Sequence, residues 1–71
     1  MYQFTRSKVL PIFLERRIPI KQLAKEAGVS EKTAEKAVNG LPITAVVVAR
    51  IADALGVAPL DVLVENGVEI R

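Results

Sequence analysis

The sequence predicts an all-α domain of five short helices and leaves room for a short strand pair at the two ends of the chain. Three observations support this fold class. Apolar residues recur at helical spacing in five segments, residues suited to helix caps bound the segments, and no repeat or linker divides the chain. Seventy-one residues that are 51% hydrophobic suffice for one core, so we expect residues 1–71 to form a single domain.

The first helix is predicted to have Ser7 as its N-cap, with Pro11 tolerated because it falls in the opening turn. Arg16 and Arg17 lie at its end, where cations suit the helix dipole. The segment "RIPIK" then ends the helix, because the residue before Pro19 disfavours helical geometry. The apolar residues that this helix carries are Val9, Leu10, Ile12, Phe13 and Leu14.

The next two helices are short and are joined by a tight turn. "IKQLAKEAG" predicts a helix that ends at Gly28 as a left-handed C-cap. Ser30 is the predicted N-cap of "EKTAEKAVNG", with Glu31 in its favourable first turn and Asn39-Gly40 at its end. Their predicted inward residues are Ile20, Leu23, Ala24 and Ala27 in the first helix and Ala34, Ala37 and Val38 in the second.

The fourth helix, "TAVVVARIADALG", is predicted between the caps Thr44 and Gly56, and the fifth, "PLDVLVE", begins near Pro59. Two interpretations of the tail "VENGVEIR" remain open. Gly67 either turns a hairpin or caps the fifth helix; we favour the cap, with "VEIR" as a strand that could pair with "YQFT". The predicted core residues of these two helices are Val47, Val48, Ile51, Ala52, Leu55, Leu60, Leu63 and Val64.

Composition excludes several classes of function. The chain has no cysteine and no histidine, so a thiolate metal site and the commonest general base are both missing. Its carboxylates are scattered, so we expect no enzyme, no metal, no cofactor and no small-molecule substrate. No segment approaches the roughly 20 apolar residues that cross a membrane, and the N-terminus lacks the features of a signal peptide. We therefore expect a cytoplasmic protein without a membrane partner.

Charge is distributed unevenly along the chain. Residues 1–40 hold eight Lys or Arg against four Asp or Glu, a net +4, whereas residues 41–71 hold two against four, a net −2. A basic first half favours a polyanionic partner, although an ordinary solvated surface would carry the same balance.

The segment of residues 20–39 resembles a helix-turn-helix, in which the second helix enters the major groove of DNA. Residues 18–64 resemble the phage-repressor class of such domains, which contains lambdoid repressors and Cro-type proteins. The matching segments are "QLAKEAGVS", Thr33, "NG" at 39–40, "IADALGV" and "LDVLV". The lactose-repressor class shares the G-V-S-x-x-T framework, but "IADALGV" and the short helix after it favour the phage-repressor class.

This resemblance implies a set of contacts with DNA. The base-reading positions fall on Glu31, Lys32 and Lys36, which suit cytosine N4 and guanine O6 or N7. The implied backbone contacts are Lys21, Ser30, Thr33, Asn39 and Lys8, with Arg6 and Lys25 in support. Alternatives remain open: Glu31 could only stabilise its helix, the lysines could be solvated or paired with Glu35, and Asn39 could only cap.

The chain departs from the family at three places. The segment "LPITAVV" has no charge, Pro19 and Ile20 stand where relatives carry polar groups, and Phe13 and Val38 replace a charged pair between helices one and three. The uncharged segment suggests a dimer surface at Leu41, Ile43 and Val46, unless Leu41 and Ile43 pack into the core. A second candidate surface is strand pairing through the terminal residues Tyr2, Phe4, Val68 and Ile70.

The resemblance implies a small transcriptional regulator, Cro-like or repressor-like, that binds specific sequences of double-stranded DNA as a homodimer. An antitoxin of a toxin–antitoxin pair would have the same features. The rival interpretation is a protein-interaction or dimerisation module that keeps the fold without binding DNA, which the uncharged segment and Pro19 would permit.

Overall fold

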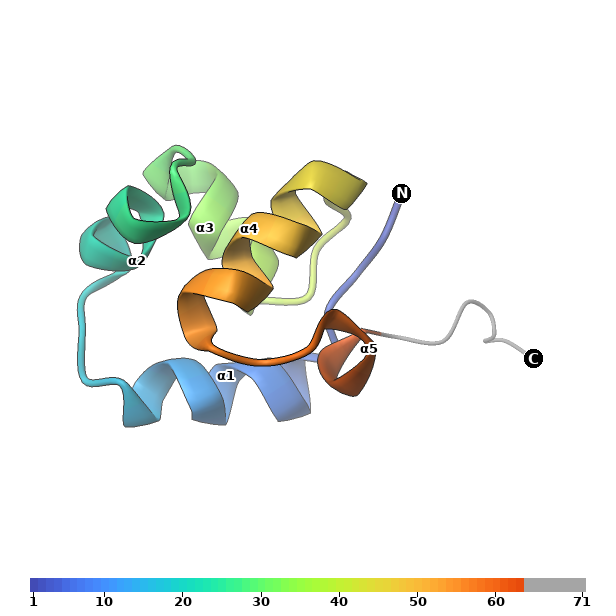
Figure 1. The fold of residues 1–71 in the computed structure, drawn as a ribbon, viewed down its shortest axis with the longest axis horizontal. Coiled ribbons are helices and arrows are strands. Elements are labelled where there is room, and N and C mark those ends of the chain that lie inside the picture. The colour runs from blue at the N-terminus through green and yellow to red at the C-terminus, as the bar shows by residue number, and fades with distance from the viewer. Residues whose placement is uncertain (64–71) are drawn as a thin grey trace.

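Five helices make up the part of the chain that the structure, a computed structural model, describes, namely residues 1–63. They are α1 (Arg6–Glu15), α2 (Ile20–Ala27), α3 (Glu31–Val38), α4 (Ala45–Leu55) and α5 (Pro59–Val62). Figure 1 shows α1 along one side of the molecule, with α2, α3 and α4 grouped on the opposite side. The predicted all-α class is confirmed, and none of the helices in residues 1–63 has the length and apolarity that a membrane span needs.

The caps of the three central helices are those that the sequence predicts. The Ser30 and Thr44 side chains accept hydrogen bonds from the backbone N–H groups of the third residues of their helices, at 3.1 Å and 3.4 Å. Gly28 and Gly56 end α2 and α4 in the left-handed region, at φ 72° and 74°. A side chain at either glycine would be strained, so these residue types set the helix boundaries.

One hydrophobic cluster joins all five helices. The alanines of α2 and α3 allow these helices to approach closely, and α4 contributes larger aliphatic side chains. The largest fully buried side chains are Phe4, Val9, Leu23, Ile51 and Val62. Most of the predicted core residues of α2, α3 and α4 are confirmed as buried, while Ile20 and Val47 are half-buried at the edge of the cluster.

The start of α1 differs from the prediction. The N-cap is Thr5 rather than Ser7, so Pro11 lies inside the helix and not in its opening turn. The cause is a tertiary contact: the Thr5 N–H donates to the Val62 carbonyl at 2.6 Å, and this bond fixes where the helix begins. Of the apolar residues that this helix carries, Leu14 lies roughly 140° around the helix from the buried Val9 and is 62% exposed.

The end of α1 is held by long-range contacts. Arg16 caps the helix and its guanidinium donates to the Ala54 carbonyl at 2.8 Å and to the Glu26 carboxylate at 3.2 Å, so it joins α1 to α4 and α2. Arg17 follows in the left-handed region at φ 57°, where non-glycine residues are uncommon. These contacts are a role for Arg16 beyond the predicted interaction with the helix dipole.

The short helix α5 also differs in the residue that it buries. Val62 is fully buried, whereas Leu60, a predicted packing residue, is 79% exposed. A helix of one turn is too short for its apolar spacing to show which side faces the core. Leu63 is half-buried as expected, and Val64 lies outside the described residues.

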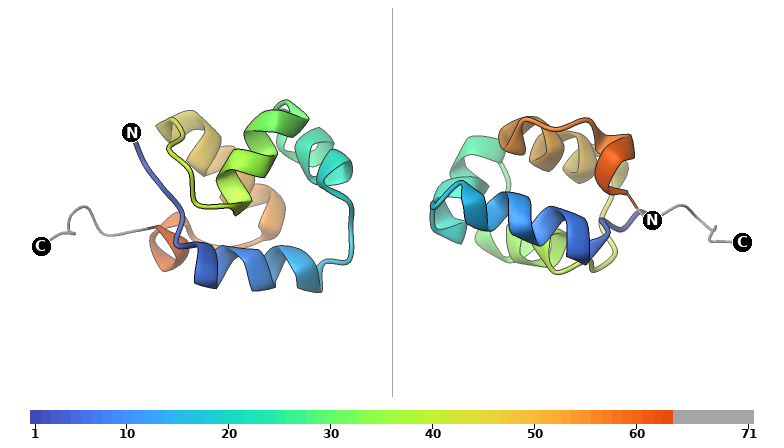
Figure 2. Two further views of the ribbon diagram at one scale, coloured as in Figure 1. Left: turned by 180° about the vertical axis from the view of Figure 1, so that it is seen from behind. Right: turned by 90° about the horizontal axis from the view of Figure 1, so that it is seen from below.

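The N-terminal arm, residues 1–5, is extended and pairs with two distant segments. Tyr2 exchanges two backbone hydrogen bonds of 2.8 Å with Ile43, and Phe4 forms an antiparallel bridge with Leu63. Figures 1 and 2 show the arm beside the start of α4. The predicted pairing of "YQFT" with "VEIR", and the predicted cap Gly67, lie outside the described residues.

Candidate nucleic-acid interface

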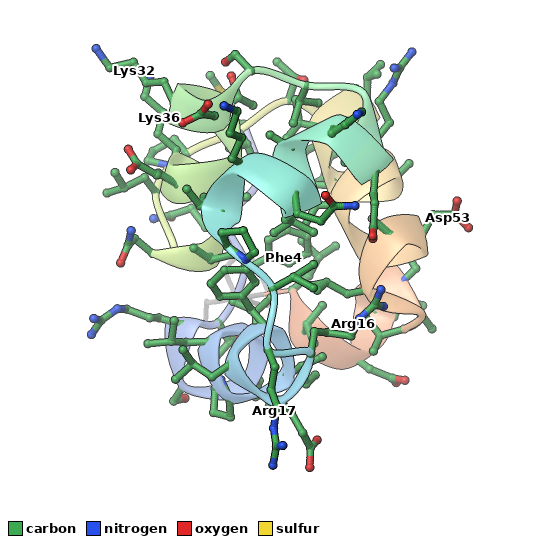
Figure 3. All side chains as sticks on the ribbon, turned by 90° about the vertical axis from the view of Figure 1, so that its left-hand side faces the viewer. Phe4, Arg16, Arg17, Lys32, Lys36 and Asp53 are labelled. Atoms are coloured by element: carbon green, nitrogen blue, oxygen red, sulfur yellow. The ribbon has the colours of Figure 1, made fainter. Side chains whose placement is uncertain are left out.

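The outer face of α3 carries two lysines that stand clear of the fold. Lys32 and Lys36 are exposed and lie one helical turn apart. Figure 3 shows both extending from one side of the molecule, well away from Arg16 and Arg17. The ion pair found within residues 1–63 is Arg16–Glu26, so neither lysine forms an ion pair in this region and the alternative pairing with Glu35 is not formed.

The inner face of α3 and the turn before this helix explain why its outer face is exposed. Ala34, Ala37 and Val38 are buried against the other helices, which turns the charged side of α3 outward. A Cβ at Gly28 would come within 3.0 Å of the Arg50 guanidinium, which donates a weak hydrogen bond of 3.4 Å to the Gly28 carbonyl. The tight turn therefore needs glycine for its conformation and for the approach of α4.

The hydroxyl groups at the start of α3 are engaged with each other. The Ser30 hydroxyl accepts from the Thr33 N–H and donates to the Thr33 Oγ1 at 2.8 Å. Its single proton is thus used inside the protein, whereas the Thr33 hydroxyl accepts that bond and keeps its own proton for an outside acceptor. Of these two predicted backbone contacts, Thr33 has the donor suited to a phosphate.

A shallow hollow lies between α3 and the start of α4. Thr33 and Lys36 line it from α3, Thr44 lines it from the N-cap of α4, and Met1 lines it from the arm. The Thr44 oxygen accepts from the Val47 N–H, so its hydroxyl proton is also available to an outside acceptor. Sequence reasoning treated Thr44 only as a cap; the uncharged segment before it gave no further signal.

The remaining predicted contact residues are dispersed. Lys8 is on α1 and Lys21 on α2; both are exposed, as are Arg6 and Lys25. Figure 1 shows α1 at the side of the molecule opposite the N-terminal end of α3. The Asn39 side-chain amide donates to the Glu35 carbonyl at 2.8 Å, which is the capping role that the sequence left open.

The residues proposed for dimer contacts divide into two groups. Leu41 and Val46 are exposed, at 48% and 61%, but Ile43 belongs to the core, as the alternative interpretation held. Phe4, a candidate for strand pairing between copies, is also fully buried, so its side chain contributes to no monomer surface. Val68 and Ile70 lie outside the described residues.

The link between α1 and the other helices combines two kinds of contact. Val38 is buried in the core and Phe13 is half-buried against it, in agreement with the predicted apolar character of both positions. A charged link exists as well, but it joins α1 to α2 through Arg16 and Glu26. Sequence reasoning missed this pair because its residues are ten positions apart and on different helices.

Two short helices joined at a left-handed glycine, the second presenting a free polar face, define a helix-turn-helix. Residues 11–66 match the Cro/C1-type HTH DNA-binding domain, which is more than half of the chain. The chain therefore belongs to the Cro/C1-type family of helix-turn-helix DNA-binding domains, as its resemblance predicted. No curated protein and no solved structure gives a significant match to it.

Proposed function

We propose that this protein binds specific sequences of double-stranded DNA as a small transcriptional regulator, with α3 in the major groove. The observation that carries this proposal is the pair of exposed lysines on α3 without a carboxylate partner in residues 1–63. Lysine donates hydrogen bonds to guanine O6 and N7, and a helix of this width fits the major groove. We assign base reading to Lys32 and Lys36.

The N-terminal end of α3 would have a second function in this arrangement. Glu31 is exposed in the first turn, where a carboxylate stabilises the helix dipole. On DNA it would accept from cytosine N4, since a carboxylate near phosphate is repelled unless it finds a donor. Glu31 thus favours a cytosine opposite the start of α3.

Backbone contacts would come from the hollow between α3 and α4. Thr33 and Thr44, which line this hollow, together offer two hydroxyl protons to one phosphate. Lys21 would hold a further phosphate from α2. Ser30 then acts by positioning Thr33, and Asn39 by ending α3.

A single domain of this size makes few phosphate contacts, and we infer that it binds as a homodimer on paired half-sites. Half-sites for such dimers lie about 34 Å apart, one turn of the duplex. Two copies would combine their contacts without requiring either copy to bind tightly alone.

A fluorescence anisotropy titration against a mixed-sequence duplex at low salt tests the proposal. We expect binding at micromolar protein, weakened by salt, and at least a tenfold loss of affinity in the double variant Lys32→Ala, Lys36→Ala. The matched control is Arg17→Glu, which also lowers the formal net charge from +2 to 0 but changes a residue on the far side of the molecule.

The control separates a specific surface from general charge attraction. If Arg17→Glu weakens binding as much as the double lysine variant does, net charge and not α3 carries the affinity. Salt-independent binding, or no binding by the wild type, would show that the domain keeps its fold for another purpose.

A further inference from the structure

Three glycines in the left-handed region follow α2, α3 and α4, and the chain closes these helices in the same way. Gly28, Gly40 and Gly56 have φ angles of 72°, 76° and 74°, and after each of them a backbone N–H bonds back into the preceding helix. The three bonds run from Val29 to Ala24, from Leu41 to Lys36 and from Val57 to Ala52, at 3.0, 2.9 and 3.0 Å. The last turn of α3, which carries Lys36, is therefore closed by the peptide group between Gly40 and Leu41.

A side-chain contact from a distant segment distinguishes the closure of α3. The Gln3 side-chain amide donates to the Gly40 carbonyl at 2.9 Å. The equivalent contact at Gly28 is a weaker bond of 3.4 Å from α4, and no side chain of residues 1–63 donates to the Gly56 carbonyl. The Gly40 carbonyl and the Leu41 N–H belong to one planar peptide group, so the N-terminal arm holds the same group that closes α3.

The arm is itself fixed to the fold on both sides of Gln3. Tyr2 exchanges two backbone hydrogen bonds of 2.8 Å with Ile43, and the Phe4 side chain is fully buried. A Cβ at Gly40 would lie 3.1 Å from the Phe4 carbonyl oxygen, so the arm runs directly against the backbone at the end of α3. Figures 1 and 2 show the arm beside the connection between α3 and α4.

We propose that Gln3 is a positioning residue for Lys36. The Gln3 amide fixes the peptide group whose N–H closes the last turn of α3, and the geometry of this turn sets the direction in which the exposed Lys36 side chain leaves the helix. Linked hydrogen bonds polarise one another, so the bond at the Gly40 carbonyl strengthens the bond that the Leu41 N–H donates. This role rests on the proposed function, in which Lys36 reads bases, and it does not require Gln3 to touch DNA.

Amide hydrogen exchange measured by NMR tests the positioning step without DNA. Gln3→Met keeps a neutral side chain of similar length but removes its donor. We expect it to speed exchange of the Leu41 amide about fivefold, while the Val57 amide at the equivalent closure of α4 changes little. The matched control is Gln22→Met, which removes the other glutamine of the chain, whose amide donates to Glu26 within α2. Unchanged exchange at Leu41, or equal acceleration at Leu41 and Val57, overturns the proposal.

A double-mutant cycle in DNA binding tests the effect on Lys36, with a duplex selected from a random pool for tight binding. We expect Gln3→Met to weaken binding about fivefold, and to cause no further loss once Lys36 is replaced by alanine. The same substitution should keep its full effect in the Lys32→Ala background, and Gln22→Met should leave the affinity unchanged in both.

The outcomes of the cycle separate this role from a general loss of structure. Equal losses from Gln3→Met in the Lys32→Ala and Lys36→Ala backgrounds, or no loss in the wild-type background, overturn the proposal. If the wild type binds no DNA, the proposed function fails, and the exchange measurement alone decides whether Gln3 holds the end of α3.

Discussion

Helices α3 and α4 begin in the same way but present different faces to solvent. Each follows an extended residue with a side-chain hydroxyl, Ser30 or Thr44, that accepts from the N–H three residues further on. The outer face of α3 then carries alternating charges, whereas the first five residues of α4, 45–49, expose only alanine and Val46. The same capping chemistry starts both helices, so the outward residue types distinguish the surface proposed to bind DNA from an apolar one.

The inner faces of the two helices differ as well. The buried residues of α3 are Ala34, Ala37 and Val38, whereas α4 buries the larger Ile51 and Leu55. Because buried apolar area governs the stabilisation that a residue provides, α4 anchors the core and α3 is a thin layer against it. The comparison predicts that substitutions in the buried side of α4 lower the stability of the fold, whereas substitutions on the outer face of α3 weaken binding to DNA.

The largest expected effect is on the core contribution of α4. Ile51→Ala should lower the free energy of unfolding by about 3 kcal/mol, because Ile51 is completely buried. The matched change in α3, Val38→Ala, removes fewer buried methyl groups and should cost about 2 kcal/mol. Urea denaturation followed by circular dichroism measures both, and an equal or reversed order would contradict the assignment of α4 as the anchor.

The left-handed caps should show a smaller effect. Ala at Gly56 meets nothing within 4 Å, so it should cost only the strain of its backbone, about 1 kcal/mol. Ala at Gly28 adds the displacement of the Arg50 guanidinium, which is the flexible end of a side chain, so the extra cost is a few tenths of a kcal/mol. Thermal unfolding measures the stability loss of each variant. A larger loss in Gly56→Ala than in Gly28→Ala would contradict this interpretation of the turn at Gly28.

Removing the N-cap hydroxyl groups should have the smallest effect on stability, and the effect should be similar for the two helices. Ser30→Ala and Thr44→Ala should each cost about 1 kcal/mol of stability. Ser30 should cost slightly more, since its bond to the backbone is 3.1 Å against 3.4 Å and its hydroxyl also donates to Thr33. Urea denaturation measures both losses. If the losses in the free energy of unfolding differed several-fold between the two variants, the two helix starts would not be equivalent.

What could be predicted from the sequence is what local chemistry determines. Ser30, Thr44, Gly28 and Gly56 each set a helix end through bonds or backbone angles within a few residues. The α3 lysines were predicted in the same way, because a capped helix with a small inner face must turn its charges outward. The class of the fold followed from these elements.

The features that the sequence did not predict depend on contacts between distant segments. Thr5 begins α1 because its N–H reaches Val62, and Arg16 binds groups on α2 and α4. The exposure of Leu60 follows from the way a one-turn helix docks, which no periodicity could show. The hollow at Thr44 exists only because the arm and the α3–α4 connection are brought together.

The most direct test of the central claim is an NMR titration of the protein with a DNA duplex, following the backbone amides of α3 and α4 together. The account predicts that the largest shifts fall on residues 30–39 and on the start of α4 at Thr44, while the second half of α4, residues 50–55, changes little. Shifts concentrated on α1 or α5, with residues 31–36 unaffected, would contradict it.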